Sequence, residues 1–279
     1  MRRCPCASGW TCDTARDICV PSDGLDGGGA SDAGVDAGDP GPADTGSAPV
    51  DSGPAEMDAP QIEVDAGLDD TSCDDIYAGA IFCDGFESGD FMRWSSSMVT
   101  AGAMATLVDT PVYRGARAMN GTAPIAGGSA WVRKLLSPAI ASGEIHLRAY
   151  VYLPSTVTLS VVVEILTIGN GGDVHTHMAL DPDGRVTLIS GPTYSTGLIM
   201  PRDRWVCAQL SVVVDPALGR AALALDGMPA GFVNDIPTVP STGGYPEFGV
   251  GLWQGALATT DIGVYVDEVV LDDAPVPCD

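Results

Sequence analysis

The sequence predicts an all-β fold, an antiparallel sandwich of two sheets, preceded by an acidic linker and a small cysteine-rich module. After Cys73 the chain consists of short apolar runs with a period of two, separated by Gly, Pro, Asn and Asp. Before that point a long stretch lacks the apolar residues of a core, and the first twenty residues hold four of the eight cysteines. We therefore divide the chain into a cysteine-rich module at 1–20, a linker at 21–72 and a sandwich at 73–279.

The module at 1–20 is expected to be held together by disulfides. Its cysteines lack the Cys-x2-Cys pairs typical of zinc sites, and no histidine lies nearby; they are Cys4, Cys6, Cys12 and Cys19. Small modules of this density use disulfides in place of a core, so the spacing indicates an oxidising compartment. Four cysteines allow three pairings, which the spacing leaves open.

The linker at 21–72 contains no Lys, Arg or aromatic residue and consists largely of Asp, Gly, Ala, Pro and Ser. Ordering the backbone costs about 1–2 kcal/mol per residue, which such a segment cannot offset by burial. Its aspartates repel one another, so we expect a disordered and extended spacer. A calcium-binding repeat is disfavoured, because the regular nonapeptide glycine spacing is missing.

The sandwich at 73–279 shows the alternation of half-buried strands, and no window predicts a long amphipathic helix. In the run Ile145–Leu153, apolar residues alternate with His146, Arg148, Tyr150 and Tyr152. Turn residues separate such runs, as at Asp226-Gly227. The further strands are expected at Ser160–Ile168, Val174–Leu180, Arg185–Ser190, Trp205–Val214, Ala221–Leu225, Phe248–Trp253 and Gly263–Leu271.

Charge and hydropathy limit the partners. The formal charge is -24 and the pI about 4.1, which disfavours nucleic acid and anionic lipid. The longest apolar stretch, Val157–Ile168, is short and contains Glu164, so no transmembrane segment is expected. No apolar signal region follows Met1. We expect an extracellular or cell-surface protein whose true start lies upstream, with a lipidated cysteine there as one form of tether.

Two segments resemble known families. Residues 1–20 are similar to short Cys-x-Cys…Gly-Trp-x-Cys-Asp modules near the start of myxobacterial secreted proteins. The opening run Ile81–Asp90 with Trp94 and the closing run Gly263–Leu271 resemble concanavalin A-like jelly rolls of the LamG and laminarinase types. Between these runs, Arg204–Leu210 and Ala224–Gly227 resemble the strand pair ending in Asp-Gly of such domains. The resemblance covers 73–279 and implies a jelly roll with neighbouring end strands and one concave sheet.

The resemblance also implies a disulfide pattern and a metal. With neighbouring end strands, either Cys73 or Cys83 should bridge to Cys278, and Cys207 should take the other. Laminarinase-like relatives carry a structural calcium near the chain ends, and Asp267 matches its aspartate ligand, with Glu87 as a companion. The alternative for these two carboxylates is a solvated strand edge that discourages association.

Candidate ligand-binding residues fall on two predicted strands. His175 and His177 are two apart and face the same way, as do Arg148, Tyr150 and Tyr152 on another strand. If both faces line the concave sheet, they form a groove that suits a glycan, because aromatic rings stack on sugars and cations bind their polar groups. The alternative is that they occupy ordinary solvent-facing positions.

For function, we expect an extracellular carbohydrate-binding sandwich without catalysis. A first alternative is a polysaccharide lyase acting on a uronate polymer. Its resemblance to alginate lyases assigns catalytic roles to Arg148, Tyr150 and His175 or His177, although the tight lyase motifs are absent. The paired carboxylates of laminarinases are missing too, with Glu164 alone on its strand. A second alternative is a structural or adhesive surface protein that recognises another protein.

Overall fold

The computed structural model describes residues 10–13, 18–21, 73–77, 79–100, 102–169, 174–191 and 193–278. The chain divides into two compact units, Met1–Gln61 and Ile62–Asp279. In the first unit, two short strands, β1 (Trp10–Asp13) and β2 (Ile18–Pro21), pair antiparallel with Cys12 opposite Cys19. Cys4, Cys6 and nearly all of the predicted linker lie outside the described residues, so their disulfides and disorder stay predictions.

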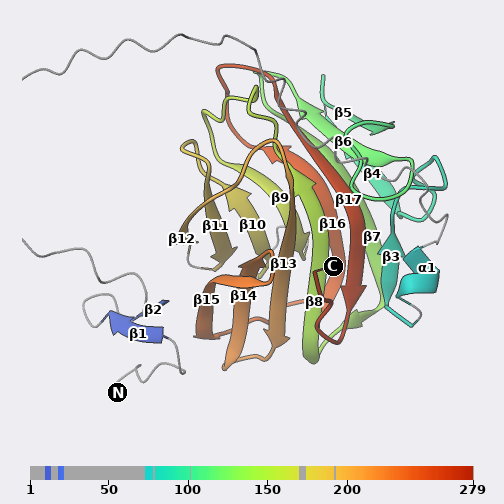
Figure 1. Ribbon diagram of the computed structural model, residues 1–279. Coiled ribbons are helices and arrows are strands. Elements are labelled where there is room, and N and C mark those ends of the chain that lie inside the picture. Colours follow the sequence, from blue (N-terminus) through green and yellow to red (C-terminus); the bar gives the residue numbers. More distant parts are fainter. Residues whose placement is uncertain are drawn as a thin grey trace, which may run out of the picture. The chain divides into compact units, whose positions relative to one another are not determined.

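The second unit is a sandwich of two antiparallel sheets, as predicted (Figure 1). One sheet has seven strands in the order β12-β11-β10-β9-β16-β7-β4. Their bounds are β4 Ser96–Val99, β7 Gly128–Ile140, β9 Val163–Ile168, β10 Thr176–Leu180, β11 Arg185–Ser190, β12 Thr193–Ile199 and β16 Tyr245–Gln254.

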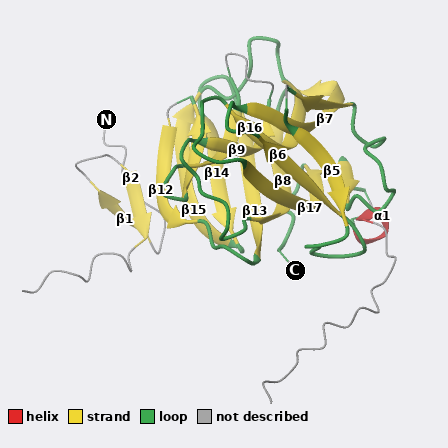
Figure 2. Cartoon of the chain, turned by 90° about the horizontal axis from the view of Figure 1, so that it is seen from above, coloured by secondary structure: helices red, strands yellow, loops and turns green. Residues whose placement is uncertain are grey.

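The other sheet has eight strands, in the order β15-β14-β13-β8-β17-β6-β5, with β3 paired to β17. Their bounds are β3 Phe82–Asp84, β5 Met104–Val108, β6 Ala118–Ala123, β8 Gly143–Tyr152, β13 Trp205–Val214, β14 Gly219–Leu225, β15 Met228–Ile236 and β17 Ile262–Asp272. A four-residue helix, α1 (Cys73–Ile76), precedes β3 and lies at the edge of the sandwich, where Figure 2 shows it in red.

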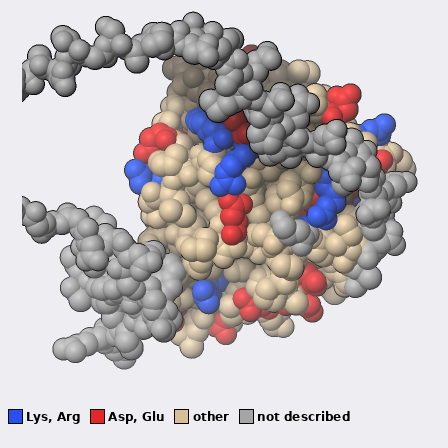
Figure 3. All heavy atoms as spheres, viewed as in Figure 1, with Lys and Arg blue, Asp and Glu red and all other residues tan. Residues whose placement is uncertain are grey.

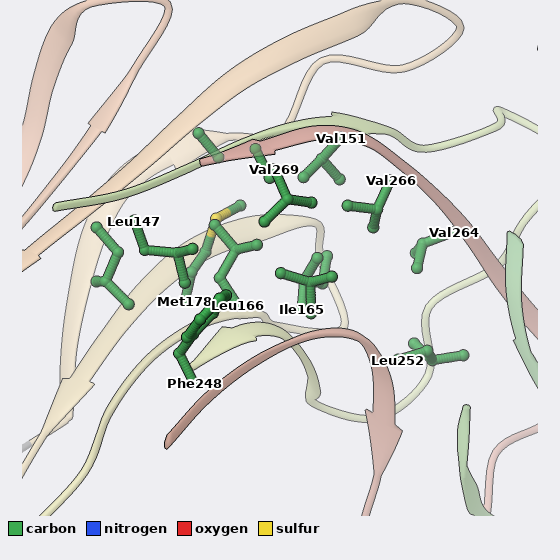
Figure 4. Packing of buried hydrophobic residues seen from close by; sticks show 14 of the residues in the cluster. Leu147, Val151, Ile165, Leu166, Met178, Phe248, Leu252, Val264, Val266 and Val269 are labelled. Atoms are coloured by element: carbon green, nitrogen blue, oxygen red, sulfur yellow. The ribbon is translucent and has the colours of Figure 1, made fainter. Parts of the chain in front are cut away.

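The core lies between the two sheets. Figure 4 shows Leu147 and Val151 of β8 facing Leu166 of β9 and Met178 of β10, together with Phe248 of β16. All five side chains are fully buried. Since alternate residues of each strand fill this layer, the remaining residues form the two outer faces. The faces that point away from the core are therefore where a site can be built.

The first and last strands of the sandwich are neighbours, as the resemblance implied. β3 pairs antiparallel with β17, with Cys83 opposite Val270. The opening motif is fixed by the buried Asp84, which accepts hydrogen bonds from Nε1 of Trp94 at 2.7 Å and from N of Phe86 at 2.9 Å. Phe82 and Trp94 pack edge to face with a centroid distance of 4.8 Å, which ties the first strand into the core.

The predicted disulfide pattern is wrong. The bonds are Cys73–Cys83, which joins α1 to β3, and Cys207–Cys278, which joins β13 to the C-terminal tail. After β17 the tail turns onto the outer face of the eight-stranded sheet (Figure 1). There Val276 packs in one cluster with Cys73 and Cys83, and its carbonyl accepts a hydrogen bond from Gln209. Cys278 thus reaches Cys207, while Cys73 lies next to Cys83 through the short helix.

The surface carries charges of both signs. On the face shown in Figure 3, Lys and Arg occur as separate patches among uncharged residues, with Asp and Glu between them. That face shows no broad basic area of the kind that binds a phosphate backbone. Within the described residues, the structure has no helix with the length and apolar character that a membrane crossing requires.

Candidate functional site

A cleft of about 370 Å³ lies on the outer face of the seven-stranded sheet. It is lined by Met98, Ser129, Trp131, Arg133, Glu164, Thr167, Gly169, His175, His177, Glu247, Phe248 and Trp253. A volume of this size matches the lower end of typical ligand sites. The mixture of histidines, carboxylates, an arginine and tryptophans makes this cleft the candidate functional site.

The centre of the cleft is a row of residues that lie side by side across four strands. His177 of β10 lies opposite Thr167 of β9, which lies opposite Gly249 of β16, and Gly249 lies opposite Arg133 of β7. Residues in register share one face of the sheet. The fold therefore places an imidazole at one end of this row and a guanidinium at the other, with a glycine between them that leaves room.

Glu164 reaches the cleft because β9 carries a bulge. Strict alternation would place Glu164 on the same face as Leu166, which is in the core. Between Leu166 and Glu164, however, the register with β10 shifts, and Ile165 joins Leu166 in the core. A bulge redirects the side chains on one side of it, and bulges are frequent beside active sites. Here it turns Glu164 toward the cleft.

Glu164 and His177 form a contact pair. Oε2 of Glu164 lies 3.0 Å from Nδ1 of His177, and their side chains are 19% and 7% exposed. Both ring nitrogens of His177 are buried, and neither makes a hydrogen bond among the described residues, so the contact with Glu164 is one of charge rather than a hydrogen bond. His175 packs against this ring with a centroid distance of 4.2 Å. A carboxylate this close to an imidazole can balance a positive charge on the ring.

Arg133 and Glu247 form the second charged pair of the cleft. Nη1 of Arg133 lies 3.2 Å from Oε2 of Glu247, and the arginine side chain is 32% exposed. Glu247 is nearly buried, with 6% of its side chain exposed. The contacts between the two side chains use Nη1. A guanidinium has further N–H groups that can bind a carboxylate in bidentate fashion.

Two tryptophans supply the apolar surface. Trp131 lies over Gly249, where a Cβ would overlap its Nε1. Trp131 is 8% exposed, whereas Trp253 is 43% exposed. An exposed aromatic face such as that of Trp253 can stack on a sugar ring. The lack of a side chain at Gly249 leaves the space that Trp131 occupies.

The predicted grouping of the ligand-binding residues is contradicted by the sheet order. His175 and His177 line the cleft of the seven-stranded sheet. Arg148, Tyr150 and Tyr152 are on β8, in the other sheet. Alternation predicts that a residue faces outward, but it does not assign the strand to a sheet, so two outward faces on opposite sheets were combined.

Arg148 is fully buried and structural. It donates hydrogen bonds to the hydroxyl of Tyr77 at 2.6 Å, to the carbonyl of Pro277 and to the carbonyl of Glu268. Its guanidinium also lies over the Tyr150 ring, at 5.1 Å from the centroid. Arg148 thus joins the C-terminal tail to β8 and β17.

Tyr150 and Tyr152 belong to an aromatic cluster on the same outer face. Tyr150 is 4% exposed and stacks on Tyr113 with a centroid distance of 3.5 Å. Tyr152 is half-buried and packs against Trp205 and Tyr265. Neither tyrosine reaches the cleft. That Tyr150 and Tyr152 bind a ligand stays a prediction, and such a ligand would lie on the outer face of the eight-stranded sheet.

Asp267 and Glu87 hold one loop. Oδ2 of Asp267 accepts hydrogen bonds from the backbone N of Tyr113 and Arg114, and Oδ1 accepts one from the backbone N of Glu268. Glu87 accepts a hydrogen bond from the backbone N of Ala116. Burial raises the pKa of Asp267 well above that of an ordinary carboxyl. The backbone hydrogen bonds lower this pKa, but their effect is smaller than that of burial.

Asp267 and Glu87 both accept hydrogen bonds from backbone N–H groups, and a calcium site at these two residues stays a prediction. Among the described residues, no group of three or more His, Cys, Asp or Glu could hold a metal ion. Calcium binding elsewhere through backbone carbonyls stays a prediction.

Comparison with known proteins gives similarity in structure alone. No known protein family matches the sequence, and no curated protein matches it either. The chain is similar to the endo-β-1,4-glucuronan lyase of Trichoderma reesei, with 15% identity, a TM-score of 0.56, and 69% of this chain and 95% of that chain covered. At this identity the likeness is one of fold, that of a β-sandwich.

Two further solved structures have a similar fold. The cellulose-induced protein Cip1 is 16% identical, with a TM-score of 0.55 and coverage of 71% of this chain and 100% of that one. The catalytic domain of a glycoside hydrolase family 131 protein from Coprinopsis cinerea is 12% identical, with a TM-score of 0.51 and coverage of 69% and 94%.

These similarities correct the expected function. A carbohydrate-binding sandwich without catalysis is contradicted, because a lyase and a glycoside hydrolase catalytic domain are among the structures that share this fold. They favour the lyase alternative. The jelly-roll resemblance agrees with these neighbours at the level of the fold, while the LamG type and the myxobacterial resemblance stay predictions.

Several cleft residues were missed in the sequence. Arg133, Glu247, Trp131 and Trp253 come from strands far apart in the chain, and Glu164 was taken as isolated. The available signal was the pattern Phe248-Gly-Val-Gly-Leu-Trp253, in which glycines take the positions facing away from the core. Glycines at alternate positions indicate that something lies close to the strand.

Proposed function

We propose that this chain is an extracellular polysaccharide lyase that cleaves a uronate-containing polymer in the cleft of the seven-stranded sheet. The observation that carries the proposal is the Glu164–His177 pair at one end of the central row, with Arg133 at the other end. The similarity of the fold to a glucuronan lyase supports it. The two disulfides of the sandwich agree with an oxidising location outside the cell.

The proposed reaction is a β-elimination. A base removes the proton from C5 of the uronate, and that electron pair forms the C4=C5 double bond. The bond from C4 to the glycosidic oxygen breaks, and the oxygen takes up a proton. No water is added, so the two products together have the composition of the substrate.

Each step has a side chain suited to it. His177 takes the C5 proton, and Glu164, whose Oε2 lies 3.0 Å from Nδ1, balances the charge of the imidazolium that forms. Arg133 binds the uronate carboxylate, which stabilises the negative charge that develops beside C5. His175, next to His177, delivers the proton to the leaving oxygen. Trp253, which is 43% exposed, positions the sugar rings.

The test is the absorbance of the conjugated C4=C5 uronate. The full chain is incubated under oxidising conditions with β-1,4-polyglucuronate, alginate and glucuronoxylan, and a neutral β-1,4-glucan serves as the blank. We expect absorbance to rise with at least one uronate polymer. Substitution His177→Ala should lower the rate by about 10²–10⁴-fold, the usual contribution of a general base.

The matched control is His146→Ala, which removes a histidine of β8 on the other sheet. It should leave the rate unchanged. If no uronate polymer develops absorbance, or if both histidine variants lose activity equally, the lyase proposal is wrong.

A glycoside hydrolase is the second candidate, because Glu164 and Glu247 both line the cleft. Such enzymes use two carboxyl groups, one as an acid and one as a base or nucleophile. The two glutamates come from β9 and β16, far apart in the chain, so the sequence did not indicate that they lie in one cleft. New reducing ends without ultraviolet absorbance would favour this candidate.

A further inference from the structure

We propose that the substrate of the cleft is a polymer in which uronate residues are separated by neutral sugars, rather than a continuous polyuronate. The inference rests on the proposed lyase function and adds the class of substrate. We argue this inference from the charged residues that line the cleft.

Among the described residues that line the cleft, Arg133 is the one Lys or Arg, while Glu164 and Glu247 are both acidic. Nη1 of Arg133 is already paired with Glu247 at 3.2 Å. The neighbouring Lys134 donates to the carbonyl of Arg93 and lies near the core ring of Phe82, so it does not add charge to the cleft. The cleft can therefore compensate one substrate carboxylate.

The two carboxylates lie on either side of the central row. Glu247 precedes Gly249 by two residues on β16, and Glu164 lies opposite Trp253, four residues beyond Gly249 on the same strand. Their carboxylates reach back to the row, since Oε2 of Glu164 contacts His177 and Oε2 of Glu247 contacts Arg133. A sugar chain that lies across the row therefore approaches a negative charge at each end of it. Carboxylates of a polyuronate placed beside Glu164 or Glu247 would be repelled, since like charges brought together across an interface are unfavourable.

The remaining cleft surface suits uncharged sugars. Trp253 is 43% exposed and Met98 is 44% exposed, and both lie at the cleft together with Trp131. Apolar and aromatic faces bind the C–H faces of neutral sugar rings. The cleft thus combines one site for a uronate with flanking surface for neutral units.

The test uses one polymer with a graded charge. Carboxyl groups of β-1,4-polyglucuronate are reduced to the neutral sugar in increasing proportions, which keeps the backbone and linkage constant. The initial rate of C4=C5 absorbance is measured per remaining uronate. We expect this rate to rise by about tenfold or more as about half of the carboxyl groups are removed, a change equivalent to roughly 1.4 kcal/mol.

A rate per uronate that falls with reduction would overturn the inference and leave the lyase function standing. No absorbance on any polymer of the series would overturn the lyase function and the inference with it. The two failures are therefore distinguishable in the same experiment.

Substitution Glu247→Gln removes one cleft charge with little change in shape. It should raise the rate on the unreduced polymer relative to the half-reduced polymer by about tenfold, again roughly 1.4 kcal/mol. Glu144→Gln is the matched control, because it changes the net charge equally on β8 of the other sheet. A ratio that shifts equally in both variants, or in neither, would contradict the role of Glu247.

Discussion

At the scale of single residues, Glu164 and Asp267 are carboxyl groups in two different environments, the cleft and the loop at Tyr113. Glu164 is partly exposed and lies beside an imidazole, so it can orient a reacting group. Asp267 is fully buried and is surrounded by backbone N–H groups, so it holds a loop in place. Burial with hydrogen-bond donors makes Asp267 a stabilising residue, whereas Glu164 lines the cleft, where we propose a functional role for it.

Substitution Asp267→Ala should lower the free energy of unfolding by about 3 kcal/mol or more. It leaves the backbone N–H groups of Tyr113, Arg114 and Glu268 without their acceptor, and each unsatisfied buried group costs about 1–3 kcal/mol. Denaturant unfolding of both proteins at one pH measures the difference. A loss below about 1 kcal/mol would mean that the loop finds other acceptors.

The raised pKa of Asp267 predicts a pH dependence. The folded state holds this proton more tightly than the unfolded chain, so the contribution of the group is greatest below about pH 4 and falls as the pH rises toward the folded pKa. The stability advantage of the native protein over Asp267→Asn should therefore shrink from pH 4 to pH 8 in denaturant unfolding. An advantage that grows with pH would show that Asp267 is ionised in the fold.

Residue types could be predicted better than their partners. The two histidines of the cleft were recognised from their spacing, and both line it. The bulge at Ile165, however, depends on the register between β9 and its neighbours, and no local pattern predicts it. Arg133 and Glu247 meet only because β7 pairs with β16, which is a long-range contact.

At the scale of elements, strands with clean alternation were predicted and irregular ones were missed. The run at Ile145–Leu153 corresponds to β8, which spans Gly143–Tyr152. β7 was not predicted, because its second half is polar or exposed and contains Pro138. The C-terminal tail has no alternation at all, so its path to Cys207, and with it the disulfide pattern, could not be read from the sequence.

The Cys207–Cys278 bond should stabilise the sandwich more than the Cys73–Cys83 bond. Their sequence separations are 71 and 10 residues, which correspond to about 4 and 3 kcal/mol when unfolded-chain entropy alone is counted. Loss of the first bond also releases the tail that covers Arg148. We expect the double Ala variant of Cys207 and Cys278 to melt at a lower temperature than that of Cys73 and Cys83.

Calorimetry of the two double variants beside the native protein measures this difference. Equal melting temperatures would show that the tail stays in place through its hydrogen bonds to Gln209 and Arg148 without the covalent link.

At the scale of the whole molecule, the sandwich followed from the sequence and the position of the site did not. Runs with a period of two determine which side chains enter the core, and the number of such runs indicates a sandwich of two sheets. Which outward face becomes a cleft depends on the sheet to which each strand belongs. That assignment separated Arg148 from His177 and brought His177 together with Arg133.

Cleavage of a uronate polymer by elimination in this cleft can be tested directly by the mass of the products. A purified uronate oligosaccharide is digested with the full chain in water enriched in ¹⁸O and analysed by mass spectrometry. Elimination should give two fragments whose masses add up to that of the substrate, with no ¹⁸O incorporated at cleavage. Fragments that together gain one labelled water would instead establish hydrolysis, and an intact substrate would contradict catalysis by this cleft.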